Sequence, residues 1–305
     1  MSCVPSSPSS PSRRRLFLAA AALPLYGLSA CSSSLRAGAN RSVDQARQRL
    51  AALETSSGGR LGVAAWNTDG GARLSHRGAE RFALCSTFKV VLAAAVLERS
   101  LAEKDLLQTS VPLPKDAFVA HSPITGKQAG KSMTVSALCA AALQYSDNTA
   151  ANSLMKVLGG PQEVTRYARS IDDSKFRLDR WETELNTALP GDPRDTGTPA
   201  AMVQNLHKLL LGKALPARER EILKTWMLGN TTGAARIRAG APSAASVADK
   251  TGSGDYGTTN DIGVVYRSGK PPVILAVYFT QPQKDAPMRN EVVAEAARIV
   301  MAAFD

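Results

Sequence analysis

The stretch that decides the fold is CSTFKVVLAAAVL, residues 85–97. Its second half is an unbroken apolar run, which predicts a buried helix. Lys89 stands at the head of that run, three positions after Ser86. Because an unpaired buried charge is costly, the lysine needs partners or a chemical role. A serine and a lysine at this spacing lie on one face of a helix, so Ser86 is a candidate nucleophile beside Lys89.

This spacing is a weak signal by itself, because Ser153 and Lys156 have it too. Two further motifs follow in order, Ser146-Asp147-Asn148 and Lys250-Thr251-Gly252. Taken singly, the first would be a helix N-cap and the second a turn before a strand. Together and in this order, the three motifs are the signature of penicillin-recognising serine enzymes.

Composition excludes several other classes of protein. The 305 residues are 44% hydrophobic, enough for a large core, and the net charge is +11. No basic run alternates with aromatic residues, so no nucleic-acid partner is expected. The three histidines lack metal-ligand spacing, and neither a metal nor a cofactor is implied.

Export would permit a disulfide between Cys85 and Cys139, but their apolar helical contexts favour buried free thiols.

Residues 1–30 have the features of an export signal. Arg13-Arg14-Arg15 precedes an apolar run and resembles a twin-arginine leader, while residues 28–31, Leu-Ser-Ala-Cys, resemble a lipobox that would make Cys31 the acylated first residue. The alternative is an ordinary signal peptidase site. The apolar run is too short to span a bilayer as a helix. We therefore expect a periplasmic protein whose membrane contact is a lipid anchor on Cys31, with residues 31–40 as a tether.

The remaining chain alternates between strand-like ends and a helical middle. A capping box at Ser42 predicts a helix to about Leu53. Further predicted helices cover 86–101, 134–144, 148–158, 163–169, 199–211, 216–228 and 290–304, and predicted strands cover 61–66, 73–76, 261–267 and 273–280. The expected fold class is α/β + α. Residues 41–82 and 230–305 would form one antiparallel sheet with flanking helices, residues 83–229 an all-helical subdomain, and the active site would occupy the cleft between them.

Residues 41–305 resemble the class A β-lactamases. Residues 85–89, 143–148 and 254–257 are most similar to the Pen-type enzymes of Burkholderia. The resemblance implies that residues 180–195 form an Ω-loop, closed by a pair between Arg180 and Asp195.

The resemblance also implies roles for site residues. Ser86 would form an acyl-enzyme, and Glu182 would be the base that activates water to hydrolyse it, with Asn186 helping to hold that water. Ser146 would pass a proton to the lactam nitrogen, kept in position by Lys89 and Lys250. Whether Lys89 or Glu182 activates Ser86 is left open. The expected substrate-binding residues are Cys85, His121, Asn148, Asn186, Arg236, Lys250, Thr251 and Ser253.

Two positions depart from patterns in the family. Gly254 stands where carbapenem-hydrolysing relatives have a second cysteine, so Cys85 cannot form their disulfide and strong carbapenemase activity is not expected. Residues 258–260 lack an arginine that many relatives carry, and Arg236 is expected to serve instead.

The expected protein is a monomeric, exported β-lactamase that hydrolyses penicillins and some cephalosporins and confers resistance, with β-lactam antibiotics and β-lactam inhibitors as its partners. Two alternatives stay open. A cell-wall peptidase or transpeptidase would share the three motifs but lack the loop base, which Glu182 and Asn186 argue against. An idle envelope lipoprotein that binds a β-lactam or a cell-wall fragment would have no chemical reason to keep Ser86, Lys89 and Lys250 together.

Overall fold

The computed structural model describes residues 29–305, and the chain divides into two units, 1–38 and 39–305. Cys3, the arginine motif and the apolar run of the predicted export signal lie outside the described residues, as does the side chain of Cys31. Helix α1 spans Ser29–Ser57. The expected tether at 31–40 is therefore helical, and the expected helix start at Ser42 is wrong. No proline interrupts this segment, so nothing stops the helix from extending toward the N-terminus.

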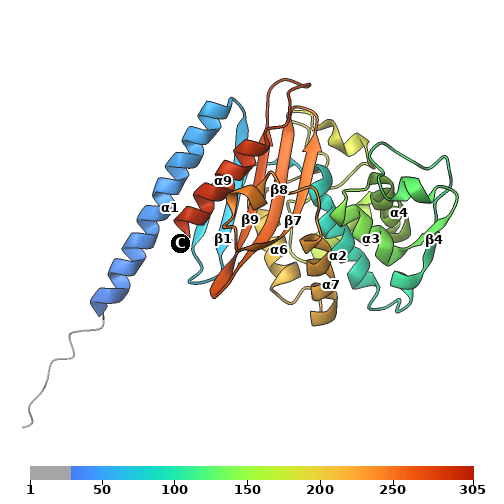
Figure 1. Ribbon diagram of the computed structural model, residues 1–305, viewed down its shortest axis with the longest axis horizontal. Coiled ribbons are helices and arrows are strands. Elements are labelled where there is room, and N and C mark those ends of the chain that lie inside the picture. Colours follow the sequence, from blue (N-terminus) through green and yellow to red (C-terminus); the bar gives the residue numbers. More distant parts are fainter. Residues whose placement is uncertain (1–28) are drawn as a thin grey trace, which may run out of the picture. The chain divides into compact units, whose positions relative to one another are not determined.

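A five-stranded antiparallel sheet is the centre of the second unit (Figure 1). Its strand order is β2 (Arg73–His76), β1 (Arg60–Asn67), β9 (Lys270–Thr280), β8 (Thr258–Arg267) and β7 (Ser246–Gly254). The register pairs Arg60 with Thr280 and Asn67 with Val273. Both ends of the chain thus build one sheet, which confirms the predicted fold class.

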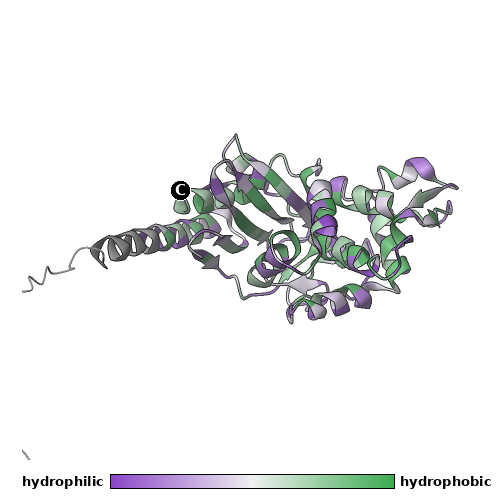
Figure 2. Cartoon of the chain, turned by 90° about the horizontal axis from the view of Figure 1, so that it is seen from below, coloured by the Kyte–Doolittle hydropathy of each residue, from purple (hydrophilic) through white to green (hydrophobic). Residues whose placement is uncertain are grey.

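Each face of the sheet carries its own apolar core. Along β9, Leu275 and Val277 belong to the core shared with α1 and with α9 (Asn290–Ala303), whereas Ile274 and Ala276 belong to the core shared with the helical part. This alternation follows from the two-residue period of a strand. Hydrophobic residues accordingly occupy much of the strands in Figure 2, with hydrophilic residues between them.

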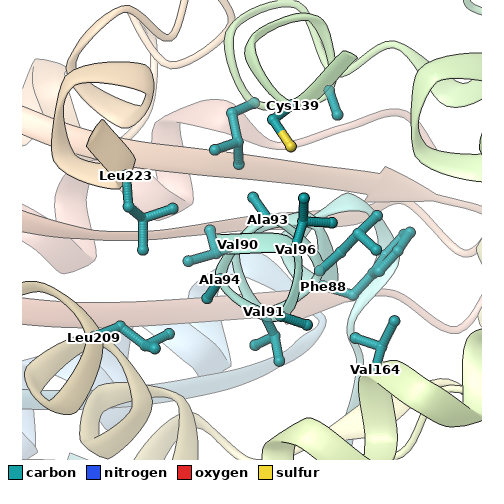
Figure 3. Packing of buried hydrophobic residues seen from close by; sticks show 14 of the residues in the cluster. Phe88, Val90, Val91, Ala93, Ala94, Val96, Cys139, Val164, Leu209 and Leu223 are labelled. Atoms are coloured by element: carbon teal, nitrogen blue, oxygen red, sulfur yellow. The ribbon is translucent and has the colours of Figure 1, made fainter. Parts of the chain in front are cut away.

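Helix α2 (Lys89–Arg99) is the axis of the helical part and is buried from Lys89 to Leu97. Five helices contribute residues to the core around it: α3 (Val135–Gln144), α4 (Asn148–Leu158), α5 (Pro161–Ser170), α6 (Pro199–Leu210) and α7 (Ala217–Leu228). In Figure 3, Cys139, Val164 and Leu209 surround α2 from different sides. A helix that is apolar on all sides is stable only in such surroundings.

Several short elements were not predicted, because periodicity cannot be read over two to four residues. Strand β3 (Phe82–Ala83) pairs with β6 (Thr196–Gly197), and β4 (Ser110–Pro112) pairs with β5 (Ser132–Thr134). Residues 83–229 are thus not entirely helical. The other unpredicted elements are the nine-residue strand β7, whose sequence has no apolar run, helix α8 (Ile237–Gly240) and the 3-10 helices η2 (Leu106–Gln108), η3 (Thr125–Gln128) and η4 (Glu184–Thr187). The helix predicted at 86–101 begins as the 3-10 helix η1 (Cys85–Phe88).

Candidate active site

Ser86 lies in η1, one turn before the buried helix α2 begins at Lys89. The Lys89 Nζ atom lies 2.9 Å from Ser86 Oγ and donates a hydrogen bond to it. Lys89 is fully buried, whereas Ser86 keeps 7% of its surface exposed. The i, i+3 spacing therefore does bring the two side chains together, with only the serine at the surface of the site.

The buried ammonium of Lys89 has three further partners. It donates to the Ser146 carbonyl oxygen at 2.8 Å and to Asn148 Oδ1 at 2.6 Å, and it lies 3.0 Å from Glu182 Oε1. Burial lowers the pKa of Lys89, and the charge of Glu182 opposes that shift. A lysine with a lowered pKa beside a serine hydroxyl can exchange a proton with it more readily than a solvated lysine.

Ser146 is held in a tight turn at the start of α4. Its backbone is left-handed, with φ 57°, and Asp147 caps the helix by accepting from Ala150 N at 2.9 Å. The N-cap interpretation of this motif and the catalytic one are therefore both compatible with the structure. The turn places Ser146 Oγ 3.0 Å from Lys250 Nζ and 3.5 Å from Lys89 Nζ.

Lys250 approaches the same serine from strand β7. The structure places Lys250-Thr251-Gly252 inside this strand, not at a turn before one. Lys250 is fully buried, and burial together with the charge of Lys89 lowers its pKa well below the ordinary value. Gly252 is needed here because a Cβ would lie 2.9 Å from the Leu84 carbonyl oxygen. The missing side chain lets β7 pack directly against the segment that carries Ser86.

Glu182 comes from the Ω-loop and faces Ser86. Ser86 Oγ donates to Glu182 Oε1 at 3.4 Å, and Asn186 Nδ2 donates to Glu182 Oε2 at 2.5 Å. The peptide between Glu182 and Thr183 is cis. The carboxylate is thus oriented between a lysine, a serine and an amide.

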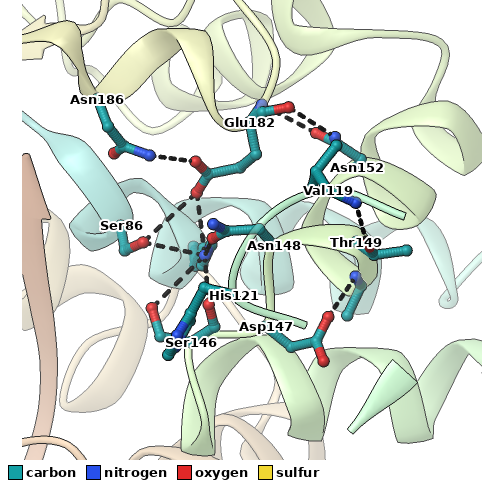
Figure 4. Close-up of polar contacts among 12 residues, drawn as sticks. Ser86, Val119, His121, Ser146, Asp147, Asn148, Thr149, Asn152, Glu182 and Asn186 are labelled. Atoms are coloured by element: carbon teal, nitrogen blue, oxygen red, sulfur yellow. Dashed lines mark hydrogen bonds and ion pairs between the residues drawn. The ribbon is translucent and has the colours of Figure 1, made fainter. Parts of the chain in front are cut away.

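Asn152 holds the backbone of Glu182 and was not predicted from the sequence. Its Oδ1 accepts from Glu182 N and its Nδ2 donates to Glu182 O, both at 2.9 Å (Figure 4). The available signal was its position four residues after Asn148, which places both asparagines on one face of α4.

The ends of the Ω-loop are joined by a buried ion pair. Arg180 Nε lies 2.6 Å from Asp195 Oδ2, and Asp195 Oδ1 accepts from the backbone N–H groups of Asp179 and Arg180. Asp195 is 1% exposed, so each of these bonds forms away from water. The closed neck fixes where the loop starts and ends, and hence the path that carries Glu182.

We expect Asp195→Asn to destabilise the protein by about 3 kcal/mol, because Arg180 then stays partly buried without its anion. Thermal unfolding measures this loss. Asp192→Asn is the matched control, since Asp192 pairs with a half-exposed Arg194 in the same loop and such pairs contribute about 0–1 kcal/mol. Equal stability losses in the two variants would contradict the assigned role of the neck.

The comparisons with known proteins agree with this geometry. A model of the Beta-lactamase enzyme family matches residues 45–304. The chain belongs to this family. It is 53% identical over 292 residues to β-lactamase Toho-1 of Escherichia coli, with 96% of this chain and 98% of that protein covered.

Solved β-lactamase structures are equally similar. One from Desulfarculus baarsii DSM 2075 has a TM-score of 0.84 and 55% identity, with 85% of this chain and 96% of that chain covered. One from Burkholderia phymatum has a TM-score of 0.85 and 52% identity, with 87% and 100% covered. The identities to enzymes of Escherichia and Burkholderia are nearly equal, so these comparisons do not favour the Pen-type subgroup over others.

In this β-lactamase, Arg236 lies outside strand β7 and contacts it. Its guanidinium donates to the Gly252 carbonyl at 2.9 Å, to the Asn260 carbonyl at 2.7 Å and to Ser253 Oγ at 2.8 Å. Asn290 Oδ1 accepts from its Nε at 2.8 Å. Burial lowers the pKa of Arg236. Arg236 is only 5% exposed, so it is not an ordinary surface arginine.

We expect Arg236→Ala to lower kcat/KM for benzylpenicillin about 10- to 100-fold, mainly by raising KM, because a charge-assisted bond is worth about 1.5–3 kcal/mol. Arg236→Lys keeps the charge without the planar fork and should recover part of the loss. Steady-state kinetics of the three proteins measure the effect. An unchanged KM in Arg236→Ala would remove Arg236 from substrate binding.

Cys85 was expected to bind substrate, and the structure contradicts a direct contact. Its thiol is fully buried and its pKa is raised by that burial. A Cβ added at Gly254 would lie 2.8 Å from Cys85 Sγ, which places this glycine directly across from the thiol. Both Cys85 and Cys139 are free and buried. Cys85 therefore packs behind the nucleophile and does not contact a ligand.

The remaining predicted binding residues have partners within the protein. His121 is exposed, and its Nε2 lies 3.1 Å from the Tyr145 carbonyl oxygen, beside Ser146 in Figure 4. Asn148 donates to the Ala120 carbonyl at 2.9 Å, and Thr251 Oγ1 lies 2.5 Å from Thr232 Oγ1. Across residues 29–305, no group of three His, Cys, Asp or Glu side chains is arranged to hold a metal ion.

Proposed function

We infer that this protein hydrolyses the β-lactam amide of penicillins and some cephalosporins through an acyl-enzyme on Ser86. The observation that carries the inference is the position of Glu182, whose Oε1 lies within 3.4 Å of Ser86 Oγ and 3.0 Å of Lys89 Nζ in a buried site. A carboxylate in this place distinguishes a hydrolase, which clears its ester, from a transpeptidase that would retain it.

Acylation first involves Ser86 with Lys89 and Glu182, and then Ser146 with Lys250. Ser86 Oγ attacks the lactam carbonyl carbon while its proton passes to the pair formed by Lys89 and Glu182. The backbone N–H groups of Ser86 and Ser253 are proposed to stabilise the oxyanion. The C–N bond then breaks, and the nitrogen takes a proton from Ser146 Oγ, which receives the proton that left Ser86 from Lys89 Nζ; Lys250 Nζ also contacts Ser146 Oγ.

Deacylation requires water at the ester. Glu182 takes a proton from that water as the water oxygen attacks the ester carbonyl carbon. The bond between this carbon and Ser86 Oγ then breaks, and Glu182 returns the proton to Ser86 Oγ. Asn186 is suited to orient the water, because its Nδ2 is bound to Glu182 while its Oδ1 is buried and has no partner among the described residues. That oxygen can accept a hydrogen bond from the water.

The substrate carboxylate has cationic and hydroxyl donors available on one strand. Lys250, Thr251 and Ser253 lie within four successive positions of β7, and Arg236 donates to Ser253 Oγ. Charge-assisted bonds from such groups recognise a carboxylate well. Asn148 is proposed to hold the substrate's side-chain amide, which would replace its present contact with the Ala120 carbonyl.

Incubation of residues 32–305 with benzylpenicillin tests the proposal, with ring opening followed optically and intact mass followed in the same sample. We expect many turnovers and no lasting adduct. A stoichiometric adduct without turnover would indicate a transpeptidase. If neither an adduct nor hydrolysis is observed, the alternative of an idle binding protein is favoured. Sedimentation of the same sample tests the proposed monomer.

We also propose that the enzyme acts in the periplasm, attached through a lipid on Cys31. The support is the arginine motif and the lipobox-like residues 28–31. No helix within residues 29–305 has the length and apolarity to cross a membrane. Membrane fractionation of cells that express the full chain tests this proposal. Cys31→Ser should move the activity from the membrane to the soluble periplasmic fraction, and an unchanged distribution would contradict lipidation.

A further inference from the structure

A cavity of about 710 Å³ lies behind the Ω-loop. Its walls are formed by residues 188–194 of the loop, by 80–83 beside strand β3, by 58–60 and by 280–282. Among the described residues, its lining includes none of Ser86, Lys89, Ser146, Glu182 and Lys250. The volume is within the range of about 300–1,000 Å³ that is typical of small-molecule sites. This space is therefore separate from the site that carries the chemistry.

The walls of this cavity are largely apolar. Leu189, Pro190 and Pro193 come from the loop side, and Phe82 and Pro282 come from the sheet side. The Arg60 guanidinium lies over the Phe82 ring, 3.8 Å from its centroid, and so covers part of the aromatic face. Pockets lined mainly by apolar side chains, with a few polar groups, are typical of sites for small apolar ligands.

The charges on the walls leave one cation without a carboxylate. Arg194 pairs with Asp192 at 2.7 Å, and Arg60 lies 3.8 Å from Glu80. Arg81 instead donates from Nη1 to the Lys175 carbonyl at 2.8 Å and to Thr196 Oγ1 at 2.9 Å. Within residues 29–305, its Nε and Nη2 have no partner. A guanidinium with two unused donors is suited to bind a carboxylate.

We propose that this cavity is a second ligand site, for a small aromatic monocarboxylate, with Arg81 as the residue that binds the anion. The bound ring would lie against Leu189 and the neighbouring prolines of the Ω-loop. Because residues 188–194 of the loop form one wall, a ligand bound here stabilises the loop in this arrangement.

The cavity is connected to the catalytic site through its floor. Thr196 Oγ1 accepts from Arg81 and donates to the Pro193 carbonyl at 2.7 Å, and Thr196 pairs with Ala83 across the short β3–β6 ladder. The next residue, Leu84, donates from its backbone N to the Asp195 carbonyl at 2.9 Å. A ligand on Arg81 therefore contacts the same segments that hold the loop neck and lead to Ser86.

The probe is 2-naphthoate, titrated calorimetrically into the full protein, with the neutral 2-naphthamide as the matched ligand. We expect naphthoate to bind and naphthamide to bind at least about tenfold more weakly, because the charge-assisted bond is lost. Arg81→Gln should weaken naphthoate binding by a similar factor. Arg47→Gln, which alters an exposed guanidinium on α1 that lines no part of this cavity, should leave it unchanged.

A second pair of variants, at Leu189, tests the site even if Arg81→Gln does not fold. Leu189 is 42% exposed and tolerates polar replacement, so Leu189→Asp should repel the anion while Leu189→Asn should not. Hydrogen exchange of residues 188–195 should slow when naphthoate is bound. The proposal is overturned if naphthoate does not bind. It is also overturned if binding is insensitive to both Arg81→Gln and Leu189→Asp but sensitive to Arg236→Ala, because the anion would then occupy the substrate site.

Discussion

Replacing Ser86 with alanine is expected to lower the rate of benzylpenicillin hydrolysis by at least about 10⁴-fold, since loss of a serine nucleophile removes the covalent route. The Ser86 hydroxyl has two partners, Lys89 Nζ at 2.9 Å and Glu182 Oε1 at 3.4 Å. The other hydroxyl of the motif, that of Thr87, is fully buried and donates to the Leu84 carbonyl at 2.7 Å. Fold stability should change little, because Lys89 keeps Ser146, Asn148 and Glu182 as partners.

The chain provides its own control for this prediction. Ser153 precedes Lys156 by the same three positions, on helix α4, but has none of the contacts of Ser86. Ser153→Ala should therefore keep hydrolysis within about twofold of the parent, as is usual for a substitution away from a site. Comparable losses in the two variants would show that the Ser-x-x-Lys motif at Ser86 is not the site of acylation.

Lys89→Met is expected to slow acylation by about 10²- to 10⁴-fold, the range for loss of a positioned acid or base. Methionine fills a similar volume, but it donates no hydrogen bond to Ser86, and Glu182 is left buried without a cation. Pre-steady-state acylation, measured on the folded fraction, separates this effect from instability. The destabilisation itself is expected to be about 3 kcal/mol, because one partner of a buried pair is removed.

Lys156→Met is the matched variant for Lys89. Lys156 is exposed near the end of α4 and has no contact with Ser86. The acylation rate of Lys156→Met should equal that of the parent enzyme. If Lys89→Met acylated as fast as Lys156→Met, Lys89 would have only a structural role, and Glu182 alone would have to activate the serine.

The sequence was informative where local spacing determines geometry. Ser86 and Lys89 meet because three positions on one helix turn bring them to the same face. The pair between Arg180 and Asp195 was expected only from the resemblance to class A β-lactamases, and the structure contains it. Strands β1, β8 and β9 were predictable because each contains a continuous apolar run. Strand β7 was not predicted, because its sequence has no apolar run and Lys250-Thr251-Gly252 was interpreted as a turn. The predictable features depend on short-range periodicity or on motifs that follow one another in order.

Contacts between distant segments could not be predicted in the same way. Asn152 binds the backbone of Glu182, and no spacing rule links position 152 to position 182. The burial of Cys85 follows from the packing of η1 against β7, where Gly254 faces the thiol. The predicted start of α1 at Ser42 was also wrong. A capping box does not prevent a helix from starting earlier, and no proline lies between Ser29 and Ser42.

The role of Glu182 is to activate the water that hydrolyses the ester formed on Ser86. The most direct test is intact mass of Glu182→Ala at successive times after mixing with benzylpenicillin, beside the parent enzyme. We expect a single adduct with the mass of one benzylpenicillin to accumulate in the variant and to decay about 10²- to 10⁴-fold more slowly than in the parent, the range for a lost general base. An adduct cleared at the parental rate would contradict the assignment of Glu182 as the base for deacylation.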